Sequence, residues 1–135
     1  MNLRSSLIAL AALGALARRG PAQASASAPD PVGVWRGTSL CLVRPSSCND
    51  EVVVYRITRT KPGDSVSMDA RKIVNGQEEE MGVLGCRVAA RGASFACTVP
   101  RGVWRFAIRG DSLVGELRLS DSTKFRDVRA VRSHQ

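Results

Sequence analysis

The chain has 135 residues, of which 20 are Lys or Arg and 12 are Asp or Glu, so its formal net charge is +8. A chain of this length, once a leader is removed, holds one hydrophobic core and has no room for a second domain. Its basic residues are scattered through the segments expected to form strands. This distribution favours a solvated surface over a site for nucleic acid or another polyanion.

The first 26 residues have the layout of a secretory signal peptide. Arg4 precedes an uncharged apolar run over residues 7–17, and small residues at 22–24 and 24–26 provide two cleavage motifs. The apolar run is shorter than the roughly 20 residues needed to span a bilayer. We therefore expect cleavage near residue 24 or 26, a single mature domain over residues 27–135 without a membrane span, and a secreted or periplasmic location. A retained membrane anchor is the lesser alternative.

After the leader, apolar and polar residues alternate and turn signals recur about every ten residues, so the mature chain is expected to be nearly all strand and turn. The first strands are expected over residues 33–43 and 50–60. Asn75-Gly76 is the strongest hairpin signal, because both central residues of a type I′ turn need positive φ. Pairing outward from this turn gives four residue pairs: Met68 with Val83 and Ala70 with Met81 on one face, Arg71 with Glu80 on the other, and Lys72 with Glu79.

Two later turns extend the same pattern. A turn centred on Arg91-Gly92 brings Cys86 opposite Cys97. A turn at Gly110-Asp111 places an aromatic-rich strand opposite the next one, with four pairs: Trp104 with Leu117, Phe106 with Gly115, Ile108 with Leu113, and Arg105 with Glu116. A last strand is expected over residues 124–132.

The four cysteines are Cys41, Cys48, Cys86 and Cys97. In an exported chain of this size they predict two disulfides, and three connectivities are possible. We expect the two local ones, which join Cys41 to Cys48 and Cys86 to Cys97. No metal site is expected, because zinc ligands are usually two to four residues apart and His134 is the only histidine.

The turns together give eight strands joined by short connections. Sequential antiparallel neighbours are then the default, and an eight-stranded meander removes its exposed edges by closing on itself. The sequence therefore predicts an all-β, up-and-down antiparallel barrel, with an open sheet or flattened sandwich as the second choice.

The first strand opens with Gly33-Val34-Trp35, and the last strand carries Arg126, Arg129 and Arg132. Here the chain resembles the lipocalin and avidin group of barrels. The resemblance implies that the first strand pairs with the last and that a basic side chain from the latter packs over the Trp35 indole. Antiparallel pairing favours Arg132 for this cation–π contact, or failing that Arg129.

A second likeness spans most of the mature chain. It is carried by residues 73–82, by Trp-Arg-Gly-Thr at 35–38, and by Phe125-Arg126. With these segments the chain resembles a set of small exported bacterial proteins without an assigned function. That likeness supports export and a β fold and implies no activity.

Twelve large side chains are expected to point into the barrel: Trp35, Tyr55, Ile57, Met68, Met81, Val83, Trp104, Phe106, Ile108, Leu113, Leu117 and Val128. They either fill it completely or leave a pocket for a small apolar or aromatic molecule. The main hypothesis is such a pocket, with the ligand-binding candidates Trp35, Tyr55, Met68, Trp104 and Phe106. Tyr55 is the expected polar contact. Asn49 and the acidic residues at 50 and 51 lie where the mouth of a barrel would be, but acidic residues after a turn are expected to be solvated.

The alternative hypothesis is an inhibitor of an exported hydrolase, or an envelope-interaction module, that acts through the loops at 44–50 and 90–94 with Arg44 and Arg91. No enzyme is expected, because the only histidine lies next to the C-terminus and no catalytic base is in sight. No nucleotide or other cofactor motif appears. Nucleic-acid binding is not expected, because Arg105 faces away from Trp104 and Phe106. The sequence gives no indication of an oligomeric state.

Overall fold

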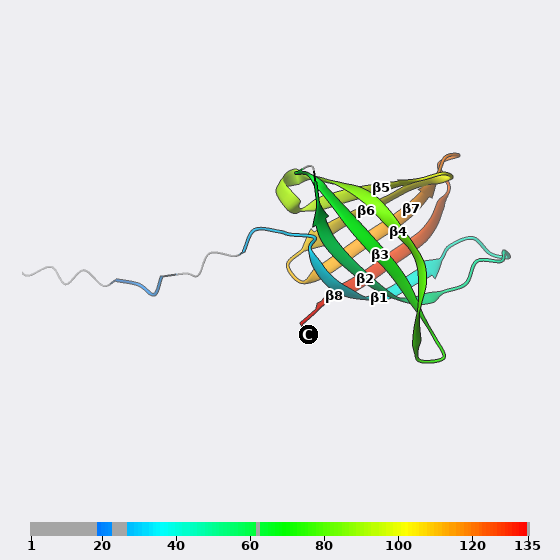
Figure 1. The fold of residues 1–135 in the computed structure, drawn as a ribbon, viewed down its shortest axis with the longest axis horizontal. Helices are drawn as coiled ribbons and strands as arrows, with labels where there is room; N and C mark the ends of the chain where they lie inside the picture. The colour runs from blue at the N-terminus through cyan, green and yellow to red at the C-terminus, as the bar shows by residue number, and fades with distance from the viewer. Residues whose placement is uncertain (1–18, 23–26, 62, 135) are drawn as a thin grey trace, which may run out of the picture.

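A computed structural model describes residues 19–22, 27–61 and 63–134, and it confirms the all-β meander and its closure. Eight antiparallel strands follow one another around a closed barrel (Figure 1). Their bounds are β1 Gly33–Cys41, β2 Glu51–Thr60, β3 Ser65–Val74, β4 Gln77–Ala89, β5 Ser94–Val99, β6 Gly102–Arg109, β7 Ser112–Leu119 and β8 Lys124–Ser133. One turn of 3-10 helix, Ala90–Gly92, is the only helix within the described ranges. The expected leader and its cleavage motifs fall mostly on residues 1–18 and 23–26, which lie outside the described residues.

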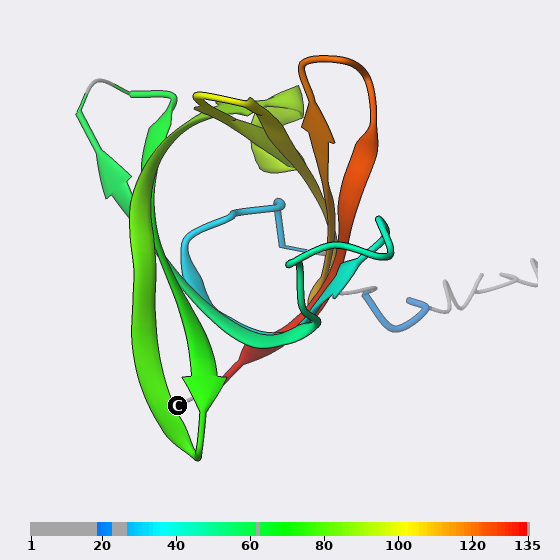
Figure 2. The same cartoon turned by 90° about the vertical axis from the view of Figure 1, so that its right-hand side faces the viewer.

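Closure occurs between the first and last strands, as the sequence predicts. The β1–β8 ladder runs from Val34 opposite Ser133 to Cys41 opposite Arg126. Seen along the barrel, the strands form a ring (Figure 2). Because each strand has two neighbours, no strand of the barrel keeps a free edge.

The turn at Asn75-Gly76 forms with positive φ at both residues, 50° and 77°. Arg71 then lies opposite Glu80 and Lys72 opposite Glu79, which confirms the part of the register nearest the turn.

Farther from the turn, the predicted register of the β3–β4 pair is wrong. The ladder shifts by one residue between Ala70 and Arg71, so Ala70 lies opposite Gly82 and Met68 opposite Leu84. A β-bulge inserts an extra residue into one strand, and every side chain beyond it changes face. Gly82 has a φ of 151°, which a residue without a Cβ adopts readily. As a result Val83, expected inside, is 58% exposed, whereas Met81, the extra residue of the bulge, is 41% exposed and still lines the interior cavity.

The other two predicted registers are confirmed. The β6–β7 pair has Trp104 opposite Leu117, Phe106 opposite Gly115, Ile108 opposite Leu113 and Arg105 opposite Glu116. The β4–β5 pair has Arg87 opposite Ala96, and one step farther in the same register Cys86 lies opposite Cys97. Both expected disulfides form, Cys86–Cys97 with a Cα–Cα separation of 4.2 Å and Cys41–Cys48 with 5.8 Å.

Trp35 closes one end of the barrel. Its side chain is fully buried, its indole Nε1 donates to the Pro31 carbonyl over 2.9 Å, and the Arg132 guanidinium lies 4.2 Å from the ring centroid. Arg132 also donates to the carbonyl oxygens of Asp30 and Val32, both over 2.8 Å. The segment before β1 crosses the end of the barrel in Figure 2 and is held there by hydrogen bonds from Trp35 and Arg132.

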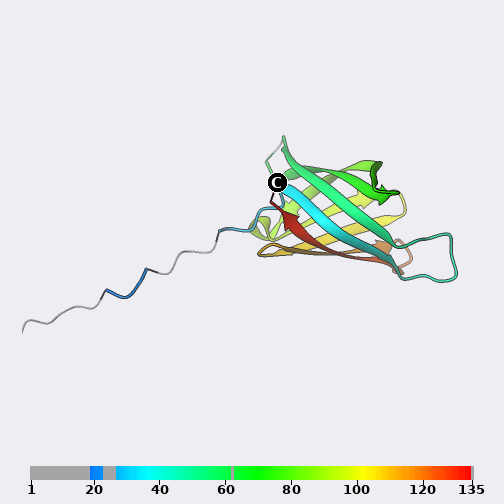
Figure 3. The same ribbon diagram turned by 90° about the horizontal axis from the view of Figure 1, so that it is seen from below.

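The opposite end carries the loop between β1 and β2, which projects beyond the strands (Figures 1 and 3). Since consecutive strands run in opposite directions, the turns at 75–76, 100–101 and 120–123 share this end, and the turn at 90–93 lies at the Trp35 end. The two loops predicted for the inhibitor hypothesis, 44–50 and 90–94, are therefore at opposite ends of the molecule.

Candidate functional site

A cavity of about 270 Å³ lies inside the barrel on the side away from Trp35. Its volume is just under the lower limit of about 300 Å³ that is usual for small-molecule sites. Most of its wall is apolar and comes from β2, β3, β4 and β6: Tyr55, Met68, Ala70, Met81, Gly82, Leu84, Trp104 and Phe106. The remaining wall is polar and comes from β1, β2 and β8: Ser39, Glu51 and Arg126. The interior is thus partly filled by its own side chains and partly hollow.

The aromatic part of the wall consists of Tyr55, Trp104 and Phe106, and Phe106 also packs against Phe95, which does not line the cavity. Phe106 stacks with Phe95 at a centroid distance of 4.8 Å and with Trp104 at 5.8 Å, and the interplanar angles are 15° and 12°. Tyr55 meets the edge of Phe106 at 5.9 Å and 72°. A Cβ at Gly115, opposite Phe106, would overlap the Phe106 ring, so this glycine makes room for the ring. Offset-stacked and edge-on arrangements of this kind favour aromatic rings over one another.

The polar part of the wall is assembled by strand register. Ser39 on β1 lies opposite Glu51 on β2, and Arg126 on β8 lies opposite Cys41, two residues farther along β1. The Arg126 Nη1 donates to the Ser39 hydroxyl over 3.2 Å and to its carbonyl oxygen over 3.4 Å, and it lies 3.5 Å from the Glu51 carboxylate. The side chains of Arg126 and Glu51 are only 13% and 20% exposed. They form an ion pair that is largely shielded from solvent.

Tyr55 stands between the apolar and polar parts of the wall. The residue is 3% exposed, and its hydroxyl forms no hydrogen bond with any residue in the described ranges. Burial raises the pKa of Tyr55 far above its ordinary value; the nearby Glu51 carboxylate raises it further, and Arg126 partly opposes this. The hydroxyl is therefore protonated at physiological pH and can donate a hydrogen bond into the cavity.

Four of the five ligand-binding candidates, Tyr55, Met68, Trp104 and Phe106, line this cavity. The fifth, Trp35, lies at the closed end with Arg132 and does not. Of the two arginines considered for Trp35, Arg132 makes the contact, while Arg129 is exposed on the outer face, where it pairs with Thr38.

Sequence reasoning missed the three polar members Ser39, Glu51 and Arg126. The acidic residue at 51 was expected to be solvated, and the structure corrects this, because Glu51 shares its strand face with Val53 and Tyr55. The alternation of two residues also places Ser39 on the face of Trp35 and Arg126 on that of Val128. The two-residue alternation therefore placed all three side chains inside, but polar side chains are normally assigned to the outer face of a barrel.

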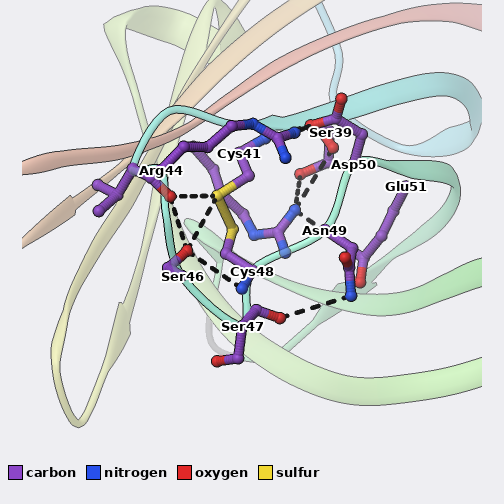
Figure 4. Close-up of a disulfide and its surroundings, with 11 residues drawn as sticks. Ser39, Cys41, Arg44, Ser46, Ser47, Cys48, Asn49, Asp50 and Glu51 are labelled. Carbon is purple, nitrogen blue, oxygen red and sulfur yellow. Dashed lines mark hydrogen bonds and ion pairs between the residues drawn. A yellow bond between two sulfur atoms is a disulfide. The ribbon is translucent and has the colours of Figure 1, made fainter.

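The β1–β2 loop stands next to the polar wall and is tied internally (Figure 4). The Cys41–Cys48 disulfide closes it, the backbone N–H of Cys41 donates to the Asp50 carboxylate over 2.8 Å, and Arg44 pairs with the same carboxylate at 2.8 Å. The Ser46 hydroxyl donates to the Val43 carbonyl oxygen over 2.6 Å. These contacts hold the chain in place directly before Glu51.

Within the described ranges, no group of three or more His, Cys, Asp or Glu side chains is placed to hold a metal ion. In the same part of the chain, no helix has the length and apolar character to cross a membrane. The chain matches no protein-family model, and no curated protein matches it. The closed eight-stranded antiparallel barrel is compatible with the lipocalin and avidin architecture.

Proposed function

We propose that the barrel binds one small, largely apolar molecule in its cavity and that it acts by binding and not by catalysis. The observation that carries the proposal is the Tyr55 hydroxyl, which lines a cavity with aromatic and aliphatic walls and has no hydrogen-bond partner among the described residues. A tyrosine hydroxyl that lines a cavity and has no protein partner there can donate a hydrogen bond to a bound molecule or accept one from it. A few polar groups in an apolar cavity are typical of small-molecule sites.

We further propose that the protein is a lipocalin-like module, exported after removal of residues 1–26. Support comes from the closed barrel, from the Gly33-Val34-Trp35 opening of β1, and from the position of Arg132 over the Trp35 indole. The two disulfides also support export, because such bonds persist mainly in oxidising compartments.

The two tryptophans provide a direct test, since Trp104 lines the cavity and Trp35 does not. A ¹⁵N-labelled mature domain would be titrated with small apolar compounds from benzene to naphthalene derivatives, and the two indole N–H signals followed by NMR. We expect saturable shifts of the Trp104 signal and little change at Trp35. The absence of a saturable shift for every compound would contradict the proposal.

Two leucine variants serve as a matched pair in the same titration. Ala70 lines the cavity and is 7% exposed, so Ala70→Leu fills part of the cavity and is expected to abolish the shifts. Ala107, on the outer face of β6, does not line this cavity, so Ala107→Leu is expected to retain them.

A second candidate function, as an inhibitor or envelope-interaction module, is favoured by one observation. The β1–β2 loop is closed by a disulfide and presents Leu42, which is 46% exposed, and Arg44, whose side chain is 57% exposed. Rigid exposed loops commonly carry protein-binding residues. Inhibition of trypsin or lysozyme that is lost in Leu42→Ala or Arg44→Ala, but kept in Arg91→Ala at the other end, would support this candidate; no inhibition of either hydrolase would count against it.

A further inference from the structure

We propose that the molecule bound in the cavity is electrically neutral, with a flat aromatic body and one polar edge that both accepts and donates hydrogen bonds, as a primary amide does. This inference rests on the proposed binding function. It concerns the chemistry of the same cavity and follows from the charge balance, the free hydrogen-bonding capacity and the ring geometry of its wall.

The charge balance comes from one cation and one anion. Arg126 and Glu51 are the charged side chains that line the cavity among the described residues, and their closest atoms are 3.5 Å apart. Because the two side chains lie this close together, the charge of each compensates the charge of the other, and both are mostly shielded from solvent. A ligand carboxylate would add an unbalanced negative charge and a ligand ammonium an unbalanced positive one. Burying an uncompensated charge is costly, so a neutral ligand is favoured.

The hydrogen-bonding capacity of the polar wall is only partly used. A guanidinium has five N–H donors, and the bonds from Arg126 to Ser39 both come from Nη1. Within the described residues, Nε and Nη2 of Arg126 and the Tyr55 hydroxyl form no hydrogen bond, so donors remain for a ligand oxygen. The Glu51 carboxylate only accepts, so it suits a ligand N–H or O–H. One neutral group with both an oxygen and an N–H can accept from the Arg126 or Tyr55 donors and donate to the Glu51 carboxylate.

The apolar wall determines the shape of the rest of the ligand. Trp104 and Phe106 line the cavity with rings that are within 12° of parallel, and Trp104 is only partly buried by the protein itself. A flat aromatic ring can stack with these side chains, whereas a branched aliphatic body contacts them less completely. The volume of about 270 Å³ restricts the body to one or two fused rings.

The test uses four naphthalenes that differ only in one substituent: 2-naphthamide, 2-methylnaphthalene, 2-naphthoate and 2-naphthylmethylammonium. Dissociation constants would be measured by NMR titration of the mature domain at pH 7. We expect the amide to bind best, about threefold to tenfold more tightly than the methyl compound, which is the range of a net neutral hydrogen bond. Both ions are expected to bind more weakly than the methyl compound.

The outcomes separate this inference from the proposed function. If the methyl compound binds as well as the amide, or if either ion binds best, the inference is overturned while small-molecule binding stands. If none of the four binds, and no compound of the wider apolar panel binds, the proposed function fails and the inference fails with it.

Two conservative variants test the charge balance and the hydroxyl separately. In Glu51→Gln the Arg126 charge loses its partner, so 2-naphthoate is expected to gain at least tenfold in affinity and to overtake the amide. Glu79→Gln, at an exposed position of β4, is the control and is expected to leave the order unchanged. In Tyr55→Phe the amide is expected to lose about threefold while the methyl compound is unaffected. Thermal melts followed by circular dichroism establish that each variant is folded, and an unchanged order in folded Glu51→Gln overturns the charge argument.

Discussion

At the scale of single residues, Arg132 contacts several parts of the closed end of the barrel. It lies over the Trp35 ring, donates to two carbonyl oxygens of the segment before β1, and pairs with Asp111 at 3.3 Å. Its side chain is 21% exposed, so these contacts are partly shielded from water. One side chain thereby joins β8, β1 and the β6–β7 turn.

Replacing Arg132 by Met keeps much of the apolar stem and removes the charge and all donors. We expect the free energy of unfolding to fall by about 2 kcal/mol, from the lost cation–π contact and the unpaired carbonyl oxygens. Urea denaturation followed by Trp fluorescence measures this. Arg129→Met, on the same strand but on the exposed outer face, is the control and should change stability by less than about 0.5 kcal/mol. Equal effects of the two variants would contradict this role of Arg132.

At the scale of elements, the β3–β4 hairpin is fixed to the barrel by Glu78 on its outer face. The carboxylate accepts from the Arg56 guanidinium over 2.6 and 2.9 Å and lies 3.6 Å from Arg36, so β4 is linked to β2 and β1 across β3. The hydrogen bond from Arg56 is the largest cause that holds the pKa of Glu78 below its ordinary value. Desolvation opposes it, and the charges of Arg56, Arg36 and Arg71 lower the pKa further.

The lowered pKa of Glu78 predicts how stability depends on pH. The folded state binds the proton less tightly than the unfolded chain, so the stabilisation is present above the ordinary Glu value of about 4.5 and is lost as pH falls through the lowered value. Glu78→Gln should therefore have a lower melting temperature than the parent at pH 7, and the difference should disappear in acid. Melting curves from pH 7 to pH 3 check this, with Glu79→Gln as the control. A difference that is independent of pH would argue against the ion pair.

At the scale of the whole molecule, closure depends on a close approach of β1 and β8. Gly37 lies opposite Ala130, and a Cβ built on it would overlap the backbone carbonyl oxygen of Arg129. Because the obstacle is backbone and not the end of a flexible side chain, the strands would have to move apart. A glycine at this position therefore allows the two terminal strands to pair along their length.

Gly37→Ala is expected to reduce the free energy of unfolding by about 2–3 kcal/mol, as overpacking does in a fixed structure. Hydrogen exchange should show the loss of protection mainly in β1 and β8. Gly85→Ala is the matched control, since nothing lies within 4 Å of an added Cβ there. It should be nearly neutral. Uniform loss of protection around the barrel would mean that the β1–β8 seam is not the limiting contact.

The elements and the disulfides could be predicted because the information for them is local. Asn75-Gly76 and Gly110 provide the positive φ values that their turns need, and each turn sets the register of the two strands that it joins. The Cys86–Cys97 pair follows from such a register without any long-range information. The same reasoning failed beyond Ala70, because the bulge in β4 changes the register at a distance from the turn.

The candidate site could be predicted only in its apolar half. Tyr55, Met68, Trp104 and Phe106 were recognised as inward-facing by size and alternation, which is enough for side chains that must be buried somewhere. Glu51 and Arg126 can be buried only because they form an ion pair with each other. The two residues are 75 positions apart in the chain, and the pairing of β1 with β8 brings them together.

The sequence by itself determined the strands, their order and the local disulfides, because turn residues and alternation act between neighbours along the chain. Only the tertiary structure decided which polar side chains share the interior and how much space remains there. The tilt and closure of all eight strands set both properties together, and a buried charge is stable only where the closed barrel supplies its partner.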